Sequence, residues 1–302
     1  MKPEVKLALT RLLKYLRIGL TPIAVAFLLL AIFQSRARMA AIFSDISPVT
    51  LILLFISWLG AHLASVLFAT LVLSGMDSKA GYGTVLKIHL QSIPARYIPG
   101  GVWHTVARVS KLKELGIGGG KLSRFVVLEN ALSLLVAFSI GGLAVSISGP
   151  EAWKTLAVML SFGSFAALMF LPVFSLRKPM GFGSTLYGTV YLKIIAAIIV
   201  FWLCASTAFM FYADSVSPVT GFVGWLYTAG SYMFSWGVGF ISILTPQGMG
   251  IFELVASSLL DIGGTSTSQI ALLAGYRIII LIFDIIIWQI TNIIVYYKRK
   301  CA

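Results

Sequence analysis

Long apolar stretches alternate with short polar segments along the whole chain. Membrane helices need about 20 mostly apolar residues, and six stretches approach or exceed this length. They cover residues 18–33, 48–73, 125–148, 153–173, 186–211 and 269–297. We interpret the first as a retained helix and not as a signal peptide, because no small-residue cleavage site follows it. The pattern predicts an all-α polytopic membrane protein, with residues 1–302 forming a single membrane domain.

Two further apolar segments are each interrupted by a short run containing Pro and Gly. The run Ile98-Pro99-Gly100-Gly101-Val102-Trp103 interrupts residues 84–106. The run Thr245-Pro246-Gln247-Gly248-Met249-Gly250 interrupts residues 218–262. We call these the first break, at Pro99–Gly101, and the second break, at Pro246–Gly250. Irregular backbone at membrane depth is tolerated only where protein or a water-filled cavity covers it, so both breaks are candidates for a functional position.

The breaks occur at corresponding places in two halves of the chain. Residues 1–150 and residues 151–302 both follow the order span, span, broken segment, span. With three full spans in each half, the second half enters the membrane with the opposite orientation, as in the inverted repeats of secondary transporters. We therefore expect two inverted-topology halves, with six full transmembrane helices and two re-entrant or broken helical hairpins.

Two alternatives to this interpretation remain open. Residues 218–244 are long enough to span the membrane alone, although a further crossing would put the basic C-terminus on the opposite side. In addition, Pro and Gly are frequent in membrane helices, so a kink by itself implies no substrate. The paired position of the two breaks favours the functional interpretation.

Composition and charge agree with a membrane location and orient the chain in it. Hydrophobic residues make up 59% of the chain and charged residues 11%, far from the balance of a water-soluble domain. The net charge of +13 does not indicate nucleic-acid binding, because 18 of the 23 Lys and Arg residues border the apolar stretches. They lie in residues 1–17, 74–124, 177–178 and 298–300. The positive-inside rule predicts a multi-pass protein of the bacterial inner membrane with both termini in the cytoplasm.

Ionisable residues within the apolar segments mark candidate sites, since each costs about 2.5–3.5 kcal/mol to insert. Glu253 follows the second break, where its carboxylate is favoured by the helix dipole as an N-terminal cap, as a site residue, or as both. Arg277 and Asp284 are seven residues apart and share a helix face, which suits an internal ion pair or the lining of a cavity.

Glu129 has two candidate roles near the start of the third span. It pairs either with Arg124 at the membrane interface or with Arg96 or Arg108 beside the first break. The spacing in sequence favours Arg124 slightly. We interpret His62 and His104, which have no partner close in sequence, as satisfied helix-packing groups and not as proton carriers.

Several kinds of chemistry are not expected from the sequence. Cys204 and Cys301 are far apart and have no metal-ligand spacing with other residues, so neither a disulfide nor a metal site is predicted. Residues 116–121 resemble a phosphate-binding loop but lack the required Gly at position 115 and the Ser or Thr at position 122. No nucleophile lies near a His and a carboxylate. We expect neither enzymatic activity nor a cofactor.

The residues around the two breaks resemble a known family. Pro94-Ala95-Arg96-Tyr97-Ile98-Pro99-Gly100-Gly101-Val102-Trp103, followed by Arg108, is similar to the Tyr-x-Pro-Gly-x-x-Trp signature of the lysylphosphatidylglycerol synthase transmembrane family, also described as flippase-like membrane proteins. Pro246, Gly248, Gly250 and Glu253 resemble its second signature, with Gln247 in place of the first Gly. Larger members carry an aminoacyltransferase domain, which is not expected here. The resemblance therefore implies the lipid-translocating part.

The sequence thus leads to a site hypothesis and three functional hypotheses. The candidate substrate-binding residues are Arg96, Tyr97, Pro99, Gly100, Trp103, Arg108, Glu129, Pro246, Gly248, Gly250, Glu253, Arg277 and Asp284. The main hypothesis is the flipping or scrambling of a phospholipid or lipid-linked glycan, with membrane lipids that carry an anionic phosphate as partners. The second is a non-transporting scaffold for an envelope-lipid or glycan-assembly enzyme. The third is an ion-coupled solute transporter, disfavoured because carboxylates are scarce. A homo-oligomer is compatible with each.

Overall fold

The computed structural model describes residues 33, 36–76, 78, 80–97, 103–175, 188–241, 248, 250–260 and 265–300. Throughout these residues the regular structure is helical. In chain order the helices are α2 (Arg36–Asp45), α3 (Pro48–Gly75), α4 (Tyr82–Gln91), the 3₁₀ helix η1 (Ile93–Tyr97), α5 (Trp103–Glu114), α6 (Gly119–Ser148), α7 (Glu151–Ser175), α8 (Gly188–Val216), α9 (Gly221–Ile241), α10 (Ile251–Leu259) and α11 (Ser266–Lys300).

Five of the described helices are long and apolar enough to cross a membrane. They are α3, α6, α7, α8 and α11. Five of the six predicted spans are thereby confirmed as long apolar helices. The sixth, residues 18–33, lies almost entirely outside the described residues. The helix α9, which covers most of residues 218–244, is not among the five.

The helix N-termini show where the boundaries predicted from the apolar pattern were incomplete. At the start of α3, Ser47 Oγ accepts a hydrogen bond from the backbone N–H of Thr50 and Pro48 occupies the first helical position, both favourable at a helix N-terminus. By contrast, α6 begins at Gly119, before the predicted boundary at residue 125. Apolar periodicity detects only the part of a helix inside the membrane, whereas Lys121 and Arg124 are good helix formers. Glu129 therefore lies in the third turn of α6 and does not open the helix.

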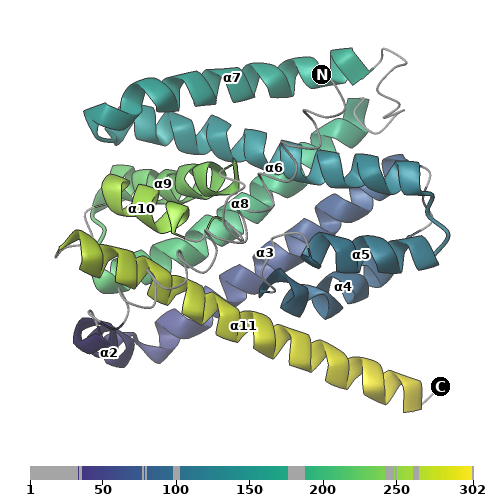
Figure 1. Ribbon diagram of the computed structural model, residues 1–302, viewed down its shortest axis with the longest axis horizontal. Coiled ribbons are helices and arrows are strands. Elements are labelled where there is room, and N and C mark those ends of the chain that lie inside the picture. Colours follow the sequence, from purple (N-terminus) through teal and green to yellow (C-terminus); the bar gives the residue numbers. More distant parts are fainter. Residues whose placement is uncertain are drawn as a thin grey trace, which may run out of the picture.

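The long helices form the framework that holds the short ones. In Figure 1, α3 and α8 lie side by side, and α6 lies between α7 and α9. The packing of α6 against α9 is close because an ideal Cβ at Gly141 would lie 2.7 Å from the carbonyl oxygen of Gly230. Small residues at such crossings allow membrane helices to approach closely. α11 contacts α4, η1 and α10.

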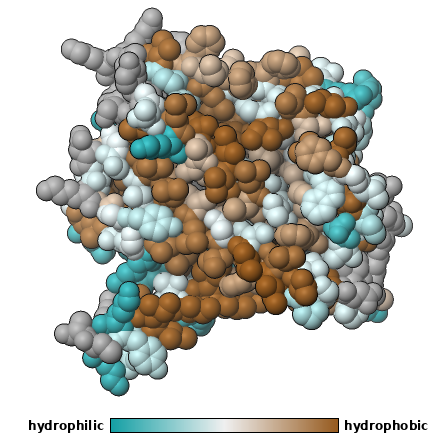
Figure 2. All heavy atoms as spheres, turned by 180° about the vertical axis from the view of Figure 1, so that it is seen from behind, coloured by the Kyte–Doolittle hydropathy of each residue, from teal (hydrophilic) through white to brown (hydrophobic). Residues whose placement is uncertain are grey.

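Large apolar side chains cover much of the outside of the molecule. On α7 the exposed ones include Met159, Phe162, Phe165, Met169, Phe170 and Val173. Figure 2 shows a broad area of hydrophobic residues across one face, with hydrophilic residues concentrated towards its margins. A water-soluble monomer rarely exposes apolar surface on this scale. The protein is therefore embedded in a membrane.

Candidate functional site

A buried carboxylate on α11 collects side chains from two other parts of the chain. Asp284 has an exposed fraction of 0%. Its Oδ1 accepts hydrogen bonds from Trp58 Nε1 at 2.7 Å and from His62 Nε2 at 2.8 Å. These donors are four residues apart on α3, so they project from one face of that helix. An apolar helix thus supplies two N–H groups to one carboxylate oxygen.

The second oxygen of Asp284 faces η1, which precedes the first break. Tyr97 donates its hydroxyl to Oδ2 at 2.7 Å, and Arg96 Nη1 lies 3.4 Å from the same oxygen. We call Asp284 together with Trp58, His62, Arg96 and Tyr97 the Asp284 centre. Full hydrogen bonding of both oxygens, with a cation beside them, is what keeps a buried carboxylate charged. The Asp284 centre therefore fixes η1 to the middle of α11.

The hydrogen-bonded network continues from the Asp284 centre into a group of histidines. His62 Nδ1 lies 3.0 Å from His89 Nε2, and the ring of His89 lies 5.5 Å, centroid to centroid, from that of His104. His62 and His89 are 3% and 1% exposed. Because a carboxylate only accepts, His62 Nε2 carries a hydrogen, so in the neutral ring Nδ1 accepts from His89 Nε2. We call His62, His89 and His104 the histidine cluster.

The surroundings of His89 and His104 favour their neutral forms. Both residues lie outside the five long apolar helices, on α4 and α5. Burial, followed by the positive charge of Arg108, lowers the pKa of His89 well below its ordinary value. Burial and the positive charge of Arg96 lower the pKa of His104 in the same way. Neutral imidazoles can both donate and accept a proton.

A second buried carboxylate lies beyond the second break. Glu253 is 0% exposed, in the first turn of α10. Its Oε2 accepts the backbone N–H of Gly250 at 2.7 Å, and its Oε1 lies 2.8 Å from Arg277 Nε. The predicted cap is therefore confirmed, and the same carboxylate also contacts Arg277. We call Glu253 and Arg277 the Glu253 pair.

Glycine shapes the backbone beside the Glu253 pair. Gly248 and Gly250 have φ values of +66° and +85°, which L-residues with a Cβ rarely adopt. An ideal Cβ at Gly248 would also lie 2.6 Å from the backbone of Gly239 on α9. Gly248 therefore packs tightly against α9.

A third ion pair connects α5 with α6. Arg108 Nη1 lies 2.7 Å from Glu129 Oε1, and the Arg108 side chain is 5% exposed. Of the three arginines that the sequence left open as partners of Glu129, the direct contact is with Arg108. The reason is that the early start of α6 places Glu129 well inside the helix, opposite α5.

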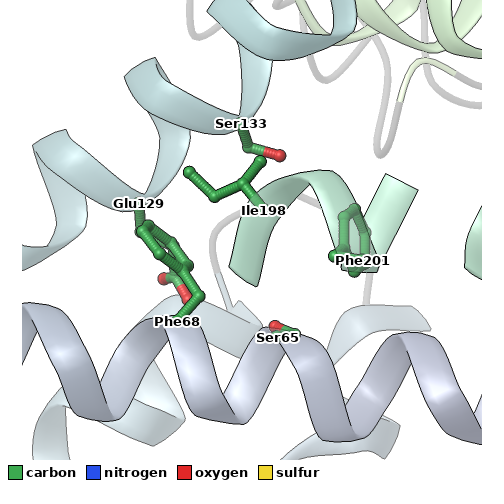
Figure 3. A pocket seen from close by; sticks show the side chains of 6 residues that line it. All are labelled: Ser65, Phe68, Glu129, Ser133, Ile198 and Phe201. Carbon is green, nitrogen blue, oxygen red and sulfur yellow. The ribbon is translucent and has the colours of Figure 1, made fainter. Parts of the chain in front are cut away.

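A small pocket lies beside Glu129 between α3, α6 and α8. It is lined by Ser65, Phe68, Glu129, Ser133, Ile198 and Phe201, as Figure 3 shows. Its volume is about 50 Å³, whereas ligand sites for drug-sized molecules measure about 300–1,000 Å³. The pocket has room for water and none for a lipid headgroup.

α11 links the two broken regions electrostatically. Arg277 contacts α10, and Asp284, two turns later on the same helix, contacts η1. Seven residues span about 10 Å along a helix axis. The internal ion pair between Arg277 and Asp284 that their spacing suggested is replaced by these contacts across the fold. Helix spacing identifies neighbours on one helix and cannot detect partners on other helices.

The structure brings together most of the described residues that the sequence selected. Arg96, Tyr97 and Asp284 meet in one centre, Arg108 meets Glu129, and Glu253 meets both Gly250 and Arg277. Trp103, at the start of α5, is 46% exposed. Pro99, Gly100 and Pro246 lie outside the described residues.

Sequence reasoning missed Trp58 and His89 and did not identify the partners of His62. His62 is hydrogen-bonded to both Asp284 and His89, as expected of a satisfied group that joins helices, but it also belongs to a charged centre that the sequence did not predict. One signal was available, since His62 is a polar residue in the middle of the long apolar helix α3. The chain contains only three histidines, and all of them lie in the histidine cluster.

The cluster does not have the arrangement of a metal centre. Within the described part of the chain, no three His, Cys, Asp or Glu side chains are placed to hold a metal ion.

Comparison of the sequence with models of protein families and with curated proteins gave no match in either case.

Proposed function

We propose that this protein moves a lipid with an anionic phosphate, either a phospholipid or a lipid-linked glycan, across the bacterial inner membrane by flipping or scrambling. Both termini are cytoplasmic in this proposal. Arg96 and Arg277 attract the phosphate, and Asp284 and Glu253 hold these arginines in position. The lipid tails remain in the bilayer during the movement.

One observation carries the proposal: two buried carboxylate–arginine contacts lie on one helix, one beside each break. Charges inside a membrane protein are costly and commonly mark substrate pathways. The side chains of Arg96 and Arg277 remain 24% and 25% exposed although their acidic partners are fully buried. A guanidinium has five N–H donors in a planar arrangement that matches phosphate oxygens. Two such groups, Arg96 on η1 and Arg277 on α11, suit an anionic headgroup better than a neutral solute.

The proposed topology follows from the same elements. In it, α4, η1 and α5 form one re-entrant segment, and α9 and α10 form the other, within two inverted halves. The arrangement of a break between helices in each half supports this topology, because inverted-repeat transporters bind substrate at such discontinuities. The residues around the two breaks also resemble flippase-like membrane proteins, which favours the same topology. The C-terminal end of α11 then faces the cytoplasm.

The proposal is tested by following lipids in proteoliposomes. Purified protein is reconstituted with headgroup-labelled anionic, zwitterionic and aminoacylated lipids, and a membrane-impermeant quencher reports which leaflet each occupies. We expect faster loss of the inner-leaflet signal than in empty liposomes, most strongly for lipids with a net negative headgroup. Glu253→Gln and Arg277→Gln are expected to abolish this acceleration while the protein remains inserted.

The matched control is Glu151→Gln, which removes an exposed ion pair with Lys154 at the start of α7. It is expected to translocate lipid like the unaltered protein. Unchanged translocation by both Glu253→Gln and Arg277→Gln would exclude these residues as the site. Absence of lipid movement for every headgroup, together with co-purification of a lipid- or glycan-assembly enzyme, would replace the proposal by the scaffold hypothesis.

A further inference from the structure

The three histidines lie in a row that ends at Asp284, with a ring contact between His104 and His89 and hydrogen bonds from His89 onwards. The contacts run from His104 to His89 at 5.5 Å between ring centroids, and from His89 to His62 at 3.0 Å. The last step, from His62 to Asp284, is 2.8 Å. His104 is partly exposed, whereas the other members are almost completely buried. The series therefore leads from the edge of the protein to the Asp284 centre.

Packing alone does not explain this series. His89 Nδ1 and His104 Nε2 are buried and have no hydrogen-bond partner among the described residues. Burying such a group without a partner costs free energy, and an apolar residue of similar size would avoid that cost. A ring nitrogen with a free lone pair is, however, what a proton acceptor requires.

We infer that His62 and Asp284 form a proton-binding site, that the site is loaded through His104 and His89, and that its loading is coupled to binding of the lipid phosphate. The coupling rests on the proposed function, whereas the proton-binding site does not. The proton is the only species that this pathway transfers.

Each step of loading conserves protons. Before loading, His62 and His89 are neutral and both carry hydrogen on Nε2, as their contacts require. A proton arriving from the side of His104 binds His89 Nδ1. His89 then releases its Nε2 hydrogen to His62 Nδ1. His89 is again neutral, now with hydrogen on Nδ1, and His62 has become an imidazolium that donates to His89 Nε2 and Asp284 Oδ1.

Because charged groups surround the histidine cluster, one extra proton changes the charge balance of the whole region. His62 faces Asp284 on α11 and His89 on α4, with Trp58 beside it on α3. His89 and His104 are in turn near Arg96 and Arg108.

The arginines and carboxylates of these contacts balance before loading. Three arginines meet three carboxylates, in Arg96–Asp284, Arg108–Glu129 and Arg277–Glu253. After loading, Asp284 must compensate both Arg96 and the His62 imidazolium. One positive charge is then in excess beside Arg96.

An anionic phosphate is the ligand that restores the balance. Proton uptake therefore favours phosphate binding, and by reciprocity phosphate binding favours proton uptake by the same factor. A proton gradient can then bias the direction in which the lipid moves. The scarcity of carboxylates, which argued against ion coupling, is offset because histidines supply the titrating groups.

The first test observes the protons directly in the unaltered protein. Since the chain contains only three histidines, ¹⁵N-histidine labelling reports on this cluster alone, provided that purification uses a tag without histidine. Single His62→Gln, His89→Gln and His104→Gln variants assign the signals. When the sample is acidified, we expect His62 to become doubly protonated while His89 changes from the Nε2–H to the Nδ1–H tautomer. Protonation of neither residue, or protonation of His62 with no tautomer change in His89, would overturn the inference.

The second test measures coupling in proteoliposomes with an imposed pH gradient. Translocation of an anionic phospholipid is expected to accelerate about fivefold or more, in line with typical coupling between sites, and a protonophore should abolish the difference. His89→Gln and His62→Gln should lose the response to the gradient, whereas Glu151→Gln should retain it. Size-exclusion profiles and thermal unfolding in detergent identify any variant that has not folded.

The outcomes separate this inference from the proposed function. If lipid moves but neither the gradient nor the histidine signals respond, the inference is wrong and translocation stands. If the histidine signals change as expected but no lipid moves, the proton-binding site stands and translocation is wrong. If lipid moves and the response persists in His89→Gln, the assigned pathway is wrong.

Discussion

The two broken regions are held in place by different means. Beside the first break, one carboxylate accepts from four side chains on two helices. His89 extends this network by a hydrogen bond to His62, and the ring of His104 contacts that of His89. Beside the second break, one carboxylate has a backbone N–H and a single arginine as partners, and two glycines with positive φ set the chain path. The first region thus depends on side-chain contacts, and the second depends mainly on backbone geometry.

This difference suggests a division of roles. A network of several titratable groups can change its charge and still keep its hydrogen bonds. A carboxylate that caps a helix cannot release its partners without loosening the helix start. We therefore assign proton-dependent changes to the first region and rigid positioning of Arg277 to the second. The predictions below test this contrast, starting with the largest expected effect.

Asp284→Ala is expected to have the largest effect on stability. It removes the common acceptor of Trp58, His62 and Tyr97 and leaves Arg96 without this carboxylate. Removing one partner of a buried ion pair typically costs about 3–5 kcal/mol. We expect a lower midpoint of thermal unfolding in detergent and reduced yield of monodisperse protein, while Glu151→Gln behaves like the unaltered protein. A midpoint equal to that of Glu151→Gln would contradict the central role of Asp284.

Gly248→Ala is expected to have the next largest effect, through the backbone. A left-handed conformation costs an L-residue about 1–2 kcal/mol, and overpacking typically costs about 1–3 kcal/mol. Both apply here, because the added Cβ would meet the backbone of Gly239 at 2.6 Å. Gly119→Ala is the matched control, since nothing lies within 4 Å of a Cβ there. Equal unfolding midpoints for these two variants would show that the second region does not depend on its backbone.

Much of the fold was predictable, and most of the site was not. The long apolar helices follow from length and hydropathy, so five spans were found with errors mainly at their ends. Individual ionisable residues were also found, because any charge in an apolar helix stands out. The pairing of these residues could not be predicted, because the partners of Asp284 lie 187 to 226 residues away in sequence. His62 and His89 are isolated in sequence, and only folding brings them together.

Glu129→Gln tests how much stability is lost when a buried arginine, here Arg108, loses its carboxylate partner. The quantity compared is the free energy of unfolding. The amide can still accept from Arg108, but the buried guanidinium loses its counter-charge. We expect about 1–3 kcal/mol of destabilisation, the cost of leaving a buried polar group poorly satisfied. The measurement is the same thermal unfolding. Arg108→Gln combined with Glu129→Gln should recover part of the loss, and a double variant no better than the single one would argue against a direct interaction.

Glu253→Gln is expected to destabilise the protein least, although its carboxylate is as buried as that of Asp284. The amide oxygen still accepts the N–H of Gly250, and Arg277, one-quarter exposed, can regain contact with polar surroundings. The remaining loss is that of the ion pair between Glu253 Oε1 and the partly exposed Arg277, about 1 kcal/mol. Translocation, in contrast, is expected to be abolished, since Arg277 no longer has a fixed position. A large fall in the unfolding midpoint, equal to that of Asp284→Ala, would remove the contrast between the regions and make the Glu253 pair a structural support.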